Sequence, residues 1–545
     1  MAKVSGAYLI ARTLKEEGVE VIFYLMGGPI YEIVNNAEDF GIRAIDFRHE
    51  QAAAMAAHGY ARVTGKPGVT TAASGPGTPN LLTGQYTAFL DLAPMVTLGG
   101  AGPIEDYGRD AFQELDQVSI FETISKAVMR PTDPARYPEH ISTAVRLATE
   151  GRPGPVYVDC AEDVLYGEVE EEKVLAPSRA AKRSRSGADA DAVGQAVDML
   201  AAAKRPVVVA GGGAHWSEAG PDLQKFIEAT GIPIFTTPMS RGLVAEDHSL
   251  SMLAARSTAL READVVLVVG TRMNWIYTFG RRLGPDAKFI QIDIHSEEIG
   301  HNRNVDLGLV GDARTVVRQL IDAISGDSRF SGDEDSEWVA YLREQNAIRE
   351  ERAQELLNSS QVPIHPMRLC KEVRDVIDRD AIVTIDGNEI LHYGRQSIPV
   401  YYPGHRLNSG PSGCMGVGLP YAIGAKVAKP EVQVVAVHGD GSLGMNLMDF
   451  DTAVRHDIPI VVVVSNNEGW TARVEGVRKP GRELGYTRFD KLAEALGGHG
   501  EDVQEPDEIR PALERAFASG KPAIVNVRTD PTARALSRFV GSRME

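Results

Sequence analysis

The sequence predicts an α/β protein made of three consecutive doubly wound parallel-sheet domains. Short apolar runs rich in β-branched residues alternate with segments of helical periodicity along the whole chain, the order expected of parallel sheets covered by helices. Most of these runs stop at glycine or a small polar residue, where a parallel strand turns into the next helix. At 545 residues the chain is also too long for a single hydrophobic core.

The first domain is predicted over residues 1–167. A helix over 5–17 is followed by five apolar runs that we interpret as strands, at 21–25, 44–46, 69–72, 95–98 and 154–159. After Glu50 the segment QAAAMAAHGYAR is rich in alanine. Small residues at helical spacing let another helix approach closely, so this helix is expected to pack tightly at an interface.

Two further domains and a tail follow. The central domain is predicted over 189–326, with strands at 206–210, 265–269 and 289–292. The third is predicted over 363–530, with strands at 382–385, 434–437, 458–464 and 523–527, and residues 531–545 form a short basic tail. The charged segments 168–188 and 326–362 read as linkers, the second with an exposed helix.

One βαβ unit of the third domain carries the strongest chemical signal. An apolar strand stops at Gly439-Asp440-Gly441, a helix follows, and a second apolar strand stops at Asn466-Asn467. The carboxyl ends of parallel strands meet at one sheet edge, so Asp440 and Asn467 can converge. Their oxygens suit Mg²⁺, and a glycine-rich helix start suits a phosphate. A tight turn followed by an unrelated asparagine pair is the alternative.

Composition excludes several classes of partner. The formal net charge of −18 disfavours nucleic acid and anionic membranes. Three scattered cysteines lack metal-ligand spacing and favour a reducing compartment over a disulfide scaffold. We found no apolar run of the ~20 residues that a membrane helix requires and no signal-like N-terminus. A cytoplasmic location is therefore expected.

Two motifs resemble a known enzyme family. The GDG to NN pattern resembles the diphosphate and magnesium motif of thiamine diphosphate enzymes, and RHEQAA…GYAR followed by SGPG…N resembles the N-terminal domain of their acetolactate-synthase branch. The resemblance implies that Glu50 meets the aminopyrimidine ring across a subunit interface and acts as general acid/base, because ring atom N1′ must take up a proton. From position alone, Glu50 could equally be an ordinary acidic residue in the first turn of a helix.

The resemblance also implies the remaining cofactor contacts. Asn388 would contact the diphosphate, Gly413 would offer its carbonyl to the 4′-amino group, and Met415 would wedge between the rings. The backbone of Gly439, Gly441 and Ser442 would approach the diphosphate, while Asp440, Asn467 and the Gly469 carbonyl would bind Mg²⁺. An Asx turn at Asn388 and core filling by Met415 are the alternatives.

The central domain resembles one branch of the family. Arg272-Met273-Asn274-Trp275 is similar to a run typical of 2-hydroxyacyl-CoA lyases and oxalyl-CoA decarboxylases, whereas acetolactate synthases usually carry Arg-Phe-Asp-Asp there. An ADP-containing ligand is thus favoured over FAD. The predicted nucleotide or CoA contacts are Arg241, Arg272, Asp293 and, in a tail that could close as a lid, Arg538. Structural roles for these side chains, and a frayed tail, are the alternatives.

Substrate contacts are predicted less directly. The run GRDAFQELDQ is similar to an active-site border of that branch, so Phe112 is placed at the substrate pocket and Gln113 is predicted to face the substrate; a surface helix start is the alternative. Met26, after the first strand, and Trp470, after the asparagine pair, complete the predicted pocket. Glu468 departs from the commoner glycine, asparagine or glutamine, which leaves the substrate open.

The sequence as a whole predicts a thiamine diphosphate- and Mg²⁺-dependent carbon–carbon lyase. The preferred reaction cleaves a 2-hydroxyacyl-CoA to formyl-CoA and an aldehyde or ketone, or runs the reverse condensation. The alternatives are an acetolactate synthase-like or benzaldehyde lyase-like carboligase that acts on free 2-keto or 2-hydroxy compounds and, from another class, a non-catalytic homologue. A homodimer is the expected minimum and a homotetramer the expected assembly.

Overall fold

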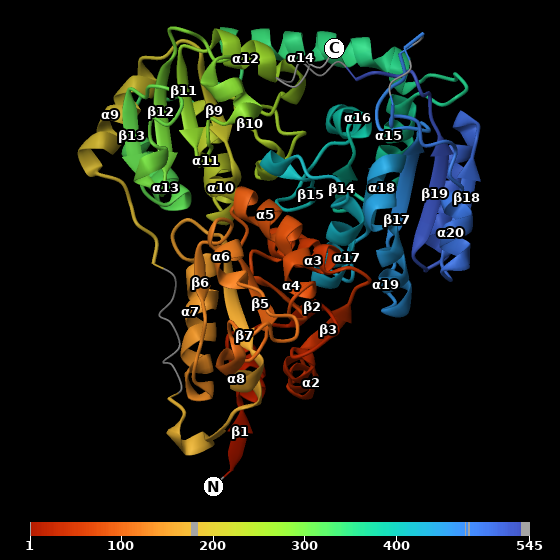
Figure 1. The fold of residues 1–545 in the computed structure, drawn as a ribbon. Helices are drawn as coiled ribbons and strands as arrows, with labels where there is room; N and C mark the ends of the chain where they lie inside the picture. Colours follow the sequence, from red (N-terminus) through yellow and green to blue (C-terminus); the bar gives the residue numbers. More distant parts are fainter. Residues whose placement is uncertain (1, 176–183, 475, 478–479, 536–545) are drawn as a thin grey trace.

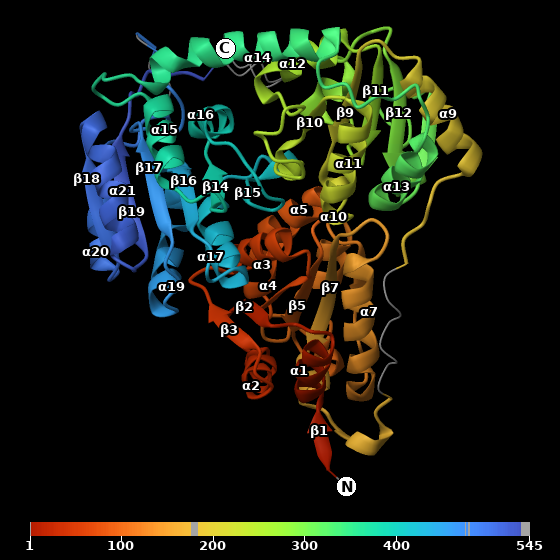
Figure 2. The ribbon, with the colours of Figure 1, turned by 180° about the vertical axis from the view of Figure 1, so that it is seen from behind.

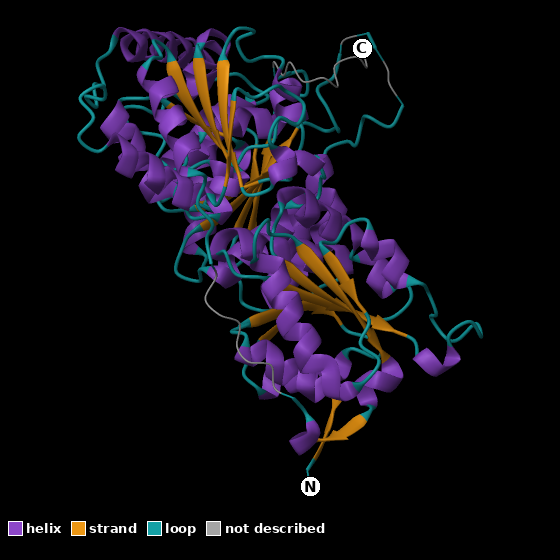
Figure 3. Cartoon of the chain, turned by 90° about the vertical axis from the view of Figure 1, so that its left-hand side faces the viewer, coloured by secondary structure: helices purple, strands orange, loops and turns teal. Residues whose placement is uncertain are grey.

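The computed structural model describes residues 2–175, 184–474, 476–477 and 480–535. These residues form three α/β units, each built on one large sheet whose strands are all parallel (Figure 1). Helices cover the sheets on both sides (Figure 3). The predicted fold class is confirmed.

The N-terminal sheet has the strand order β3-β2-β4-β5-β7-β6. Chain order reverses between β2 and β4, and at such a switch point the loops leave in opposite directions and open a crevice. Its strands are β2 Val21–Leu25, β3 Arg43–Asp46, β4 Gly68–Ala72, β5 Met95–Ala101, β6 Ala127–Met129 and β7 Pro155–Ala161. The helices that bear on the site are α1 Gly6–Glu16, α2 Tyr31–Asp39, α3 Glu50–Thr64, α4 Gly77–Asn80, α5 Leu82–Asp91 and α7 Tyr137–Thr149.

The central sheet has the order β10-β9-β11-β12-β13, with its switch point between β9 and β11. Its elements are α9 Ala190–Ala201, β9 Pro206–Ala210, α10 Gly212–Trp216, α11 Gly220–Thr230, β10 Ile234–Thr236, α12 Arg256–Glu262, β11 Val265–Val269, η6 Trp275–Gly280, β12 Lys288–Asp293, β13 Leu307–Val310 and α13 Ala313–Ile324. The exposed helix expected in the second linker is α14 Glu337–Leu357, which runs from the central unit to the C-terminal one (Figures 1 and 2).

The C-terminal sheet, ordered β15-β14-β16-β17-β19-β18, repeats the permutation of the N-terminal one, and its switch point lies between β14 and β16. Its elements are α15 Pro366–Val376, β14 Ile382–Asp386, α16 Glu389–Ser397, β15 Arg406–Leu407, α17 Gly418–Ala428, β16 Val434–Gly439, α18 Asp440–Asn446, α19 Phe450–Arg455, β17 Val461–Asn466, α20 Phe489–Ala495, β18 His499–Val503, α21 Ile509–Ala518 and β19 Ala523–Arg528.

The alanine-rich helix α3 packs against α17 of the same chain (Figure 2). A Cβ added at Gly59 would stand 2.8 Å from the Tyr421 Cα, and one added at Gly424 would stand 2.1 Å from the Ala56 carbonyl oxygen. Such spacing leaves no room for a side chain. The expected close helix contact is therefore confirmed, and it joins the N-terminal and C-terminal units in one apolar core.

Parts of the first predicted linker, 168–188, are ordered against the domains on either side of it. Residues Glu168–Glu170 form strand β8, which pairs antiparallel with β1 Lys3–Ser5. Farther on, Arg185 forms an ion pair with Asp312 of the central unit. Among the described residues, no helix combines the length and the apolar character needed to span a bilayer.

A buried carboxyl at the junction of the N-terminal and C-terminal units predicts a pH effect on stability. Asp449 accepts the Arg48 backbone N–H at 2.8 Å, and burial raises its pKa to about 7, against about 3.9 in an unfolded chain. The folded state thus binds this proton more tightly. Its stabilising contribution is present below about pH 4 and is lost as the pH rises to about 7.

The Asp449→Asn variant keeps an oxygen for the Arg48 N–H and removes the buried charge. We expect it to melt a few degrees above the wild type at about pH 8 and close to it at about pH 4, where the carboxyl is largely protonated in the folded state and half protonated in the unfolded one. Calorimetry at the two pH values measures the difference. Equal melting temperatures at the higher pH would contradict the cost assigned to this charge.

Candidate functional site

A pocket of about 410 Å³ opens at the switch point of the C-terminal sheet. Loops that follow β14, β16 and β17 form its walls, as expected where the carboxyl ends of parallel strands meet. Most of the predicted cofactor contacts lie together here. Those that line the pocket are Asn388, Met415, Gly439, Asp440, Gly441, Asn467 and Gly469. Trp470, predicted to contact the substrate, lines it as well.

The end of the Asn467 amide lies between two acceptor oxygens at this pocket, 3.0 Å from Asp440 Oδ1 and 2.8 Å from the Gly469 carbonyl oxygen. With its NH2 group toward them, the amide donates a hydrogen bond to each. With its oxygen toward them, it would place three acceptor oxygens around a cation. Neighbouring oxygens around octahedral Mg²⁺, at ~2.0–2.1 Å from the metal, lie about 2.9 Å apart. One carboxylate, one amide and one carbonyl therefore fit that ion.

The carboxylate of this set is buried. Asp440 is 3% exposed and accepts the Gly469 N–H at 2.8 Å. Burial raises its pKa to about 6, Glu468 adds to the effect, and backbone N–H groups oppose it. A cation at the three oxygens would favour the ionised form.

Two predicted cofactor contacts, Ser442 and Gly413, are not among the residues that line this pocket. The Ser442 hydroxyl lies 3.0 Å from the carbonyl oxygens of both Asp386 and Gly439, so it donates into the protein interior and only its backbone is available to a phosphate. Gly413 has a φ of +62° in the turn that leads to Met415. That backbone conformation favours glycine.

In the N-terminal unit, Glu50 is the first residue of α3 and is 7% exposed. Its Oε2 accepts a hydrogen bond from Asn80 Nδ2 at 2.9 Å. A Cβ added at Gly77 would stand 3.3 Å from Oε1, so glycine keeps that side of the carboxylate open. His49 Nδ1 accepts the Gln51 N–H, which prevents it from also donating to Glu50 through that atom.

Asn80 is a positioning residue that the sequence did not single out. The only available signal was its place in the SGPG…N motif. Within the single chain Glu50 does not line the pocket at Asp440. The nearest recorded link runs from the next residue, Gln51, which donates to Asn446 at the end of α18.

Three of the predicted substrate residues, Met26, Phe112 and Gln113, lie near the switch point of the N-terminal sheet. Gln113 has a φ of +59°, and its Oε1 accepts a hydrogen bond from Ser74 Oγ at 2.8 Å. Phe112 is 86% exposed and Met26 is 50% exposed. Large apolar side chains that are exposed together beside a switch point are unusual on the surface of a monomeric protein.

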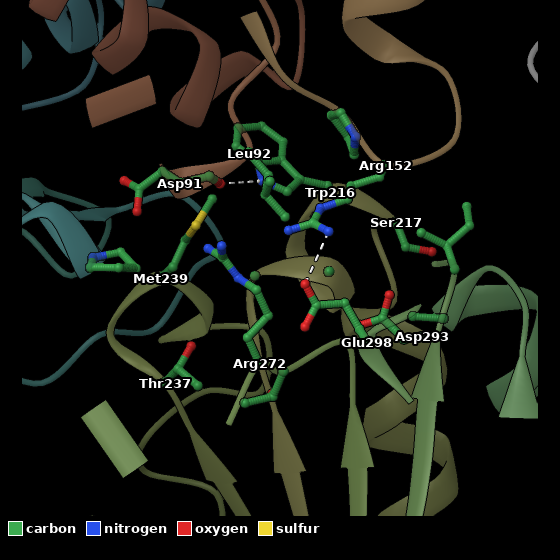
Figure 4. A pocket seen from close by; sticks show the side chains of 18 of the residues that line it. Asp91, Leu92, Arg152, Trp216, Ser217, Thr237, Met239, Arg272, Asp293 and Glu298 are labelled. Atoms are coloured by element: carbon green, nitrogen blue, oxygen red, sulfur yellow. Dashed lines mark hydrogen bonds and ion pairs between the residues drawn. The ribbon is translucent and has the colours of Figure 1, made fainter. Parts of the chain in front are cut away.

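A second, larger cavity of about 920 Å³ lies where the three units meet. It opens at the switch point of the central sheet, between the loops after β9 and β11, and is closed by residues of the other two units (Figure 4). Arg272 and Asp293 both line it, as predicted for nucleotide contacts. An ion pair of 3.0 Å between Arg152 and Glu298 spans the N-terminal and central units at its wall.

Charges inside this cavity are strongly affected by burial. The Arg272 guanidinium donates to the Leu90 carbonyl oxygen, and burial together with the nearby Arg152 lowers its pKa. Burial raises the pKa of Asp293, although its carboxylate accepts the His295 N–H at 2.9 Å. Sequence reasoning missed Arg152, which comes from the N-terminal unit.

Two predicted nucleotide contacts are not placed in this cavity. Arg241 is 5% exposed and forms a two-point ion pair with Glu246, so its charge is neutralised inside the protein and the structure gives it a role in domain packing. Arg538 lies outside the described residues. The start of the tail does reach the C-terminal pocket: Ala533 lines it, and the Ala535 N–H donates to Glu389 at 2.8 Å.

Comparisons with known proteins agree with this architecture. Residues 4–120 match the N-terminal TPP binding domain of thiamine pyrophosphate enzymes, residues 193–320 match the central domain, and residues 391–527 match the C-terminal TPP binding domain. The three matches fall on the three parallel sheets.

Relatives span almost the whole chain. It is 36% identical to an acetolactate synthase large subunit of Mycobacterium tuberculosis, over 96% of this chain and 95% of the relative. It is 37% identical to a 2-hydroxyacyl-CoA lyase of Arabidopsis thaliana (98% and 97%) and 34% identical to 2-hydroxyacyl-CoA lyase 1 of Homo sapiens (97% and 95%). Synthases and lyases are equally similar to it. The chain belongs to the thiamine pyrophosphate enzyme family and is a thiamine diphosphate-dependent enzyme.

Proposed function

We propose that this enzyme is a 2-hydroxyacyl-CoA lyase that uses Mg²⁺. It would cleave a 2-hydroxyacyl-CoA to formyl-CoA and an aldehyde or ketone, or run the reverse condensation. The supporting observation is the loop after β11, where Arg272 and Asn274 of the lyase-like run Arg272-Met273-Asn274-Trp275 line the cavity of about 920 Å³. Relatives that bear the lyase name, at 34% and 37% identity, add support.

The cofactor would lie in the C-terminal pocket. Asp440, Asn467 and the Gly469 carbonyl would hold Mg²⁺, and the backbone of Gly439 and Gly441 would approach the diphosphate. Thiamine diphosphate supplies the electron sink for breaking a carbon–carbon bond beside a carbonyl. The buried Glu50 carboxyl would hold and release the proton that its pyrimidine ring exchanges, with Asn80 fixing the orientation of that carboxyl.

The central cavity would take the ADP portion of a CoA ester or ADP itself. Asp293 would accept ribose hydroxyls, while Arg272 and Arg152 would meet phosphates. FAD is the alternative occupant, and a yellow purified protein would favour it.

We further propose a homodimer at minimum, and a homotetramer as the full assembly. Glu50 does not line the Asp440 pocket of its own chain, and large apolar side chains are exposed near these sites, namely Met26, Tyr86, Phe112, Met445 and Met448. A second copy would cover them and complete the site.

An acetolactate synthase-like carboligase acting on free 2-keto acids is the second candidate. The identity of 36% to a synthase large subunit, matched in length, favours it as strongly as the lyase relatives favour the first. A benzaldehyde lyase-like activity belongs to the same class of free substrates.

Mass spectrometry of reaction products separates these candidates. The protein is supplied with thiamine diphosphate, Mg²⁺ and a panel of 2-hydroxyacyl-CoA thioesters, and in parallel with pyruvate. We expect formyl-CoA from the thioesters and none from the Glu50→Gln control. Acetolactate from pyruvate, with no product from any thioester, would replace the lyase assignment by the carboligase one.

A further inference from the structure

The turn that carries Met415 into the cofactor pocket needs outside support to keep its shape. This Met415 turn, residues 413–417, joins the 3-10 helix η8 Gly410–Ser412 to α17. Gly413 and Gly416, on either side of Met415, have φ values of +62° and +87°. Glycine takes such values without strain, but it is also the most flexible residue. Neighbouring side chains must therefore fix the position of Met415.

Strand β14 holds the first residue of α17, Gly418, at both of its backbone polar groups. The Gly418 N–H donates to Asp386 Oδ2 at 3.0 Å, and the Gly418 carbonyl oxygen accepts a hydrogen bond from Thr384 Oγ1 at 2.9 Å. Thr384 and Asp386 are alternate residues of the strand, so both point to the face that α17 covers (Figures 1 and 2). Both side chains are buried. The sheet thereby fixes the point at which the Met415 turn becomes helix.

The Asp386 carboxylate also faces the N–H groups that precede Gly418. Burial raises the pKa of Asp386 to about 6, and the backbone N–H groups of residues 416–418 and of Gly387 oppose the rise. His438 Nδ1 lies 3.7 Å from Asp386 Oδ2, but burial lowers the pKa of His438 to about 3, so the imidazole is neutral at pH 7. The carboxylate is stabilised instead by backbone dipoles at the positive end of α17.

A third side chain holds the Met415 turn from α18. Asn446 Nδ2 donates to the Gly416 carbonyl oxygen at 2.7 Å. A Cβ added at Gly416 would stand 3.0 Å from the same nitrogen. Asn446 Oδ1 accepts a hydrogen bond from Gln51 Nε2 at 3.3 Å, and Gln51 follows Glu50 in the chain. One amide therefore links the Met415 turn to the start of the helix that carries Glu50.

We propose that Asp386 is a positioning residue that fixes the Met415 turn, assisted by Thr384 and Asn446. Asp386 itself does not line the cofactor pocket, whereas Met415 does, so the carboxylate acts through the turn. The consequence for catalysis rests on the proposed place of the cofactor in this pocket. The hold of Asp386 on the turn does not depend on that placement.

A carboxylate suits this place better than an amide of the same size. Its two oxygens accept several N–H groups, and it has no donor of its own. Asp386→Asn replaces one of these oxygens by an NH2 group, which would face the N–H groups of residues 416–418. A buried donor that faces other donors is unfavourable. We expect the Met415 turn to loosen in this variant although the volume of the side chain is unchanged.

Hydrogen exchange followed by mass spectrometry tests the hold on the turn in the full-length, cofactor-free protein. In Asp386→Asn we expect the amides of residues 416–418 to exchange about tenfold faster or more, while β16 exchanges like the wild type. The matched control is Asp378→Asn, at an exposed carboxylate just before β14.

A milder pair of variants tests the same hold if Asp386→Asn does not fold. Thr384→Val should give a smaller acceleration at residues 416–418, and Thr384→Ser, which keeps the hydroxyl, should restore the wild-type rate. Wild-type exchange at these amides in Thr384→Val, and in Asp386→Asn where it folds, would overturn the proposal.

Two further measurements need no substrate and separate positioning from general stability. Deuterium exchange at C2 of bound thiamine diphosphate should slow about tenfold or more in Asp386→Asn, because the Met415 turn is displaced. Calorimetric affinity for Mg²⁺ and the cofactor should stay close to that of the wild type, because the proposed magnesium ligands lie after β16 and β17. A loss of affinity as large as the loss of C2 exchange would contradict action through the turn.

The Met415→Ala variant shows whether the two residues act together. Residues that act through one contact have non-additive effects, so C2 exchange in the double variant should be no slower than in Met415→Ala alone. Losses that multiply would overturn action through Met415. Wild-type C2 exchange in Met415→Ala, with faster amide exchange in Asp386→Asn, would support the hold on the turn and refute the proposed place of Met415 beside the cofactor.

Discussion

Replacement of Glu50 by glutamine is expected to lower turnover by about two to four orders of magnitude while the cofactor still binds. The amide keeps the size of the side chain and the hydrogen bond from Asn80, but it cannot take up and release a proton at pH 7. Affinity for thiamine diphosphate depends chiefly on the C-terminal pocket, which Glu50 does not line. Deuterium exchange at C2 of the bound cofactor, followed by NMR, measures the proton transfer directly.

The control is Glu38→Gln, an exposed glutamate of α2 in the same unit. It should exchange and turn over like wild type. Wild-type exchange in the Glu50→Gln protein would remove Glu50 from the proton path. Loss of cofactor binding in that variant would instead point to a mainly structural carboxylate.

Replacement of Asp440 by asparagine is expected to act on binding rather than on chemistry. The substitution removes the one carboxylate among the three converging oxygens, so affinity for Mg²⁺ and thiamine diphosphate should fall about a hundredfold or more. The cofactor-free protein should become more stable, because asparagine carries no charge at a place where burial raises the pKa of the Asp440 carboxyl to about 6. Calorimetric titration and thermal melts measure the two effects.

The same pKa sets a pH dependence for the wild type. The folded-state pKa lies above the unfolded value of about 3.9, so the cofactor-free fold loses stability as the pH rises from about 4 to 6. Mg²⁺ must displace the proton, and its apparent affinity should fall about tenfold per unit below about pH 6. Asp507→Asn, at a fully exposed carboxylate of the same unit, is the control. A flat affinity between about pH 5 and 7 would contradict the raised pKa of Asp440.

Many of the strands could be predicted from the local pattern of apolar residues in the sequence. The buried strands of all three sheets are runs of valine, isoleucine and other apolar residues, and β9, β11, β14 and β16 lie where those runs predict them. The edge strands β6 and β18 escaped prediction. Each pairs on one side only, and β18, with the sequence HGEDV, is largely polar, so no continuous apolar run marks it.

The sequence by itself determined which side chains converge at the proposed magnesium site. Strand, glycine turn, helix and strand permit one right-handed connection, which brings Asp440 and Asn467 to the same sheet edge. Only the tertiary structure decided which arginines have partners. Arg241 resembled a ligand contact but pairs with Glu246 five residues later in a folded loop, while Arg152, which no motif singled out, comes from the N-terminal unit to line the central cavity beside Arg272. Backbone topology is encoded in local periodicity, whereas charge compensation depends on which surfaces the domains bury against each other.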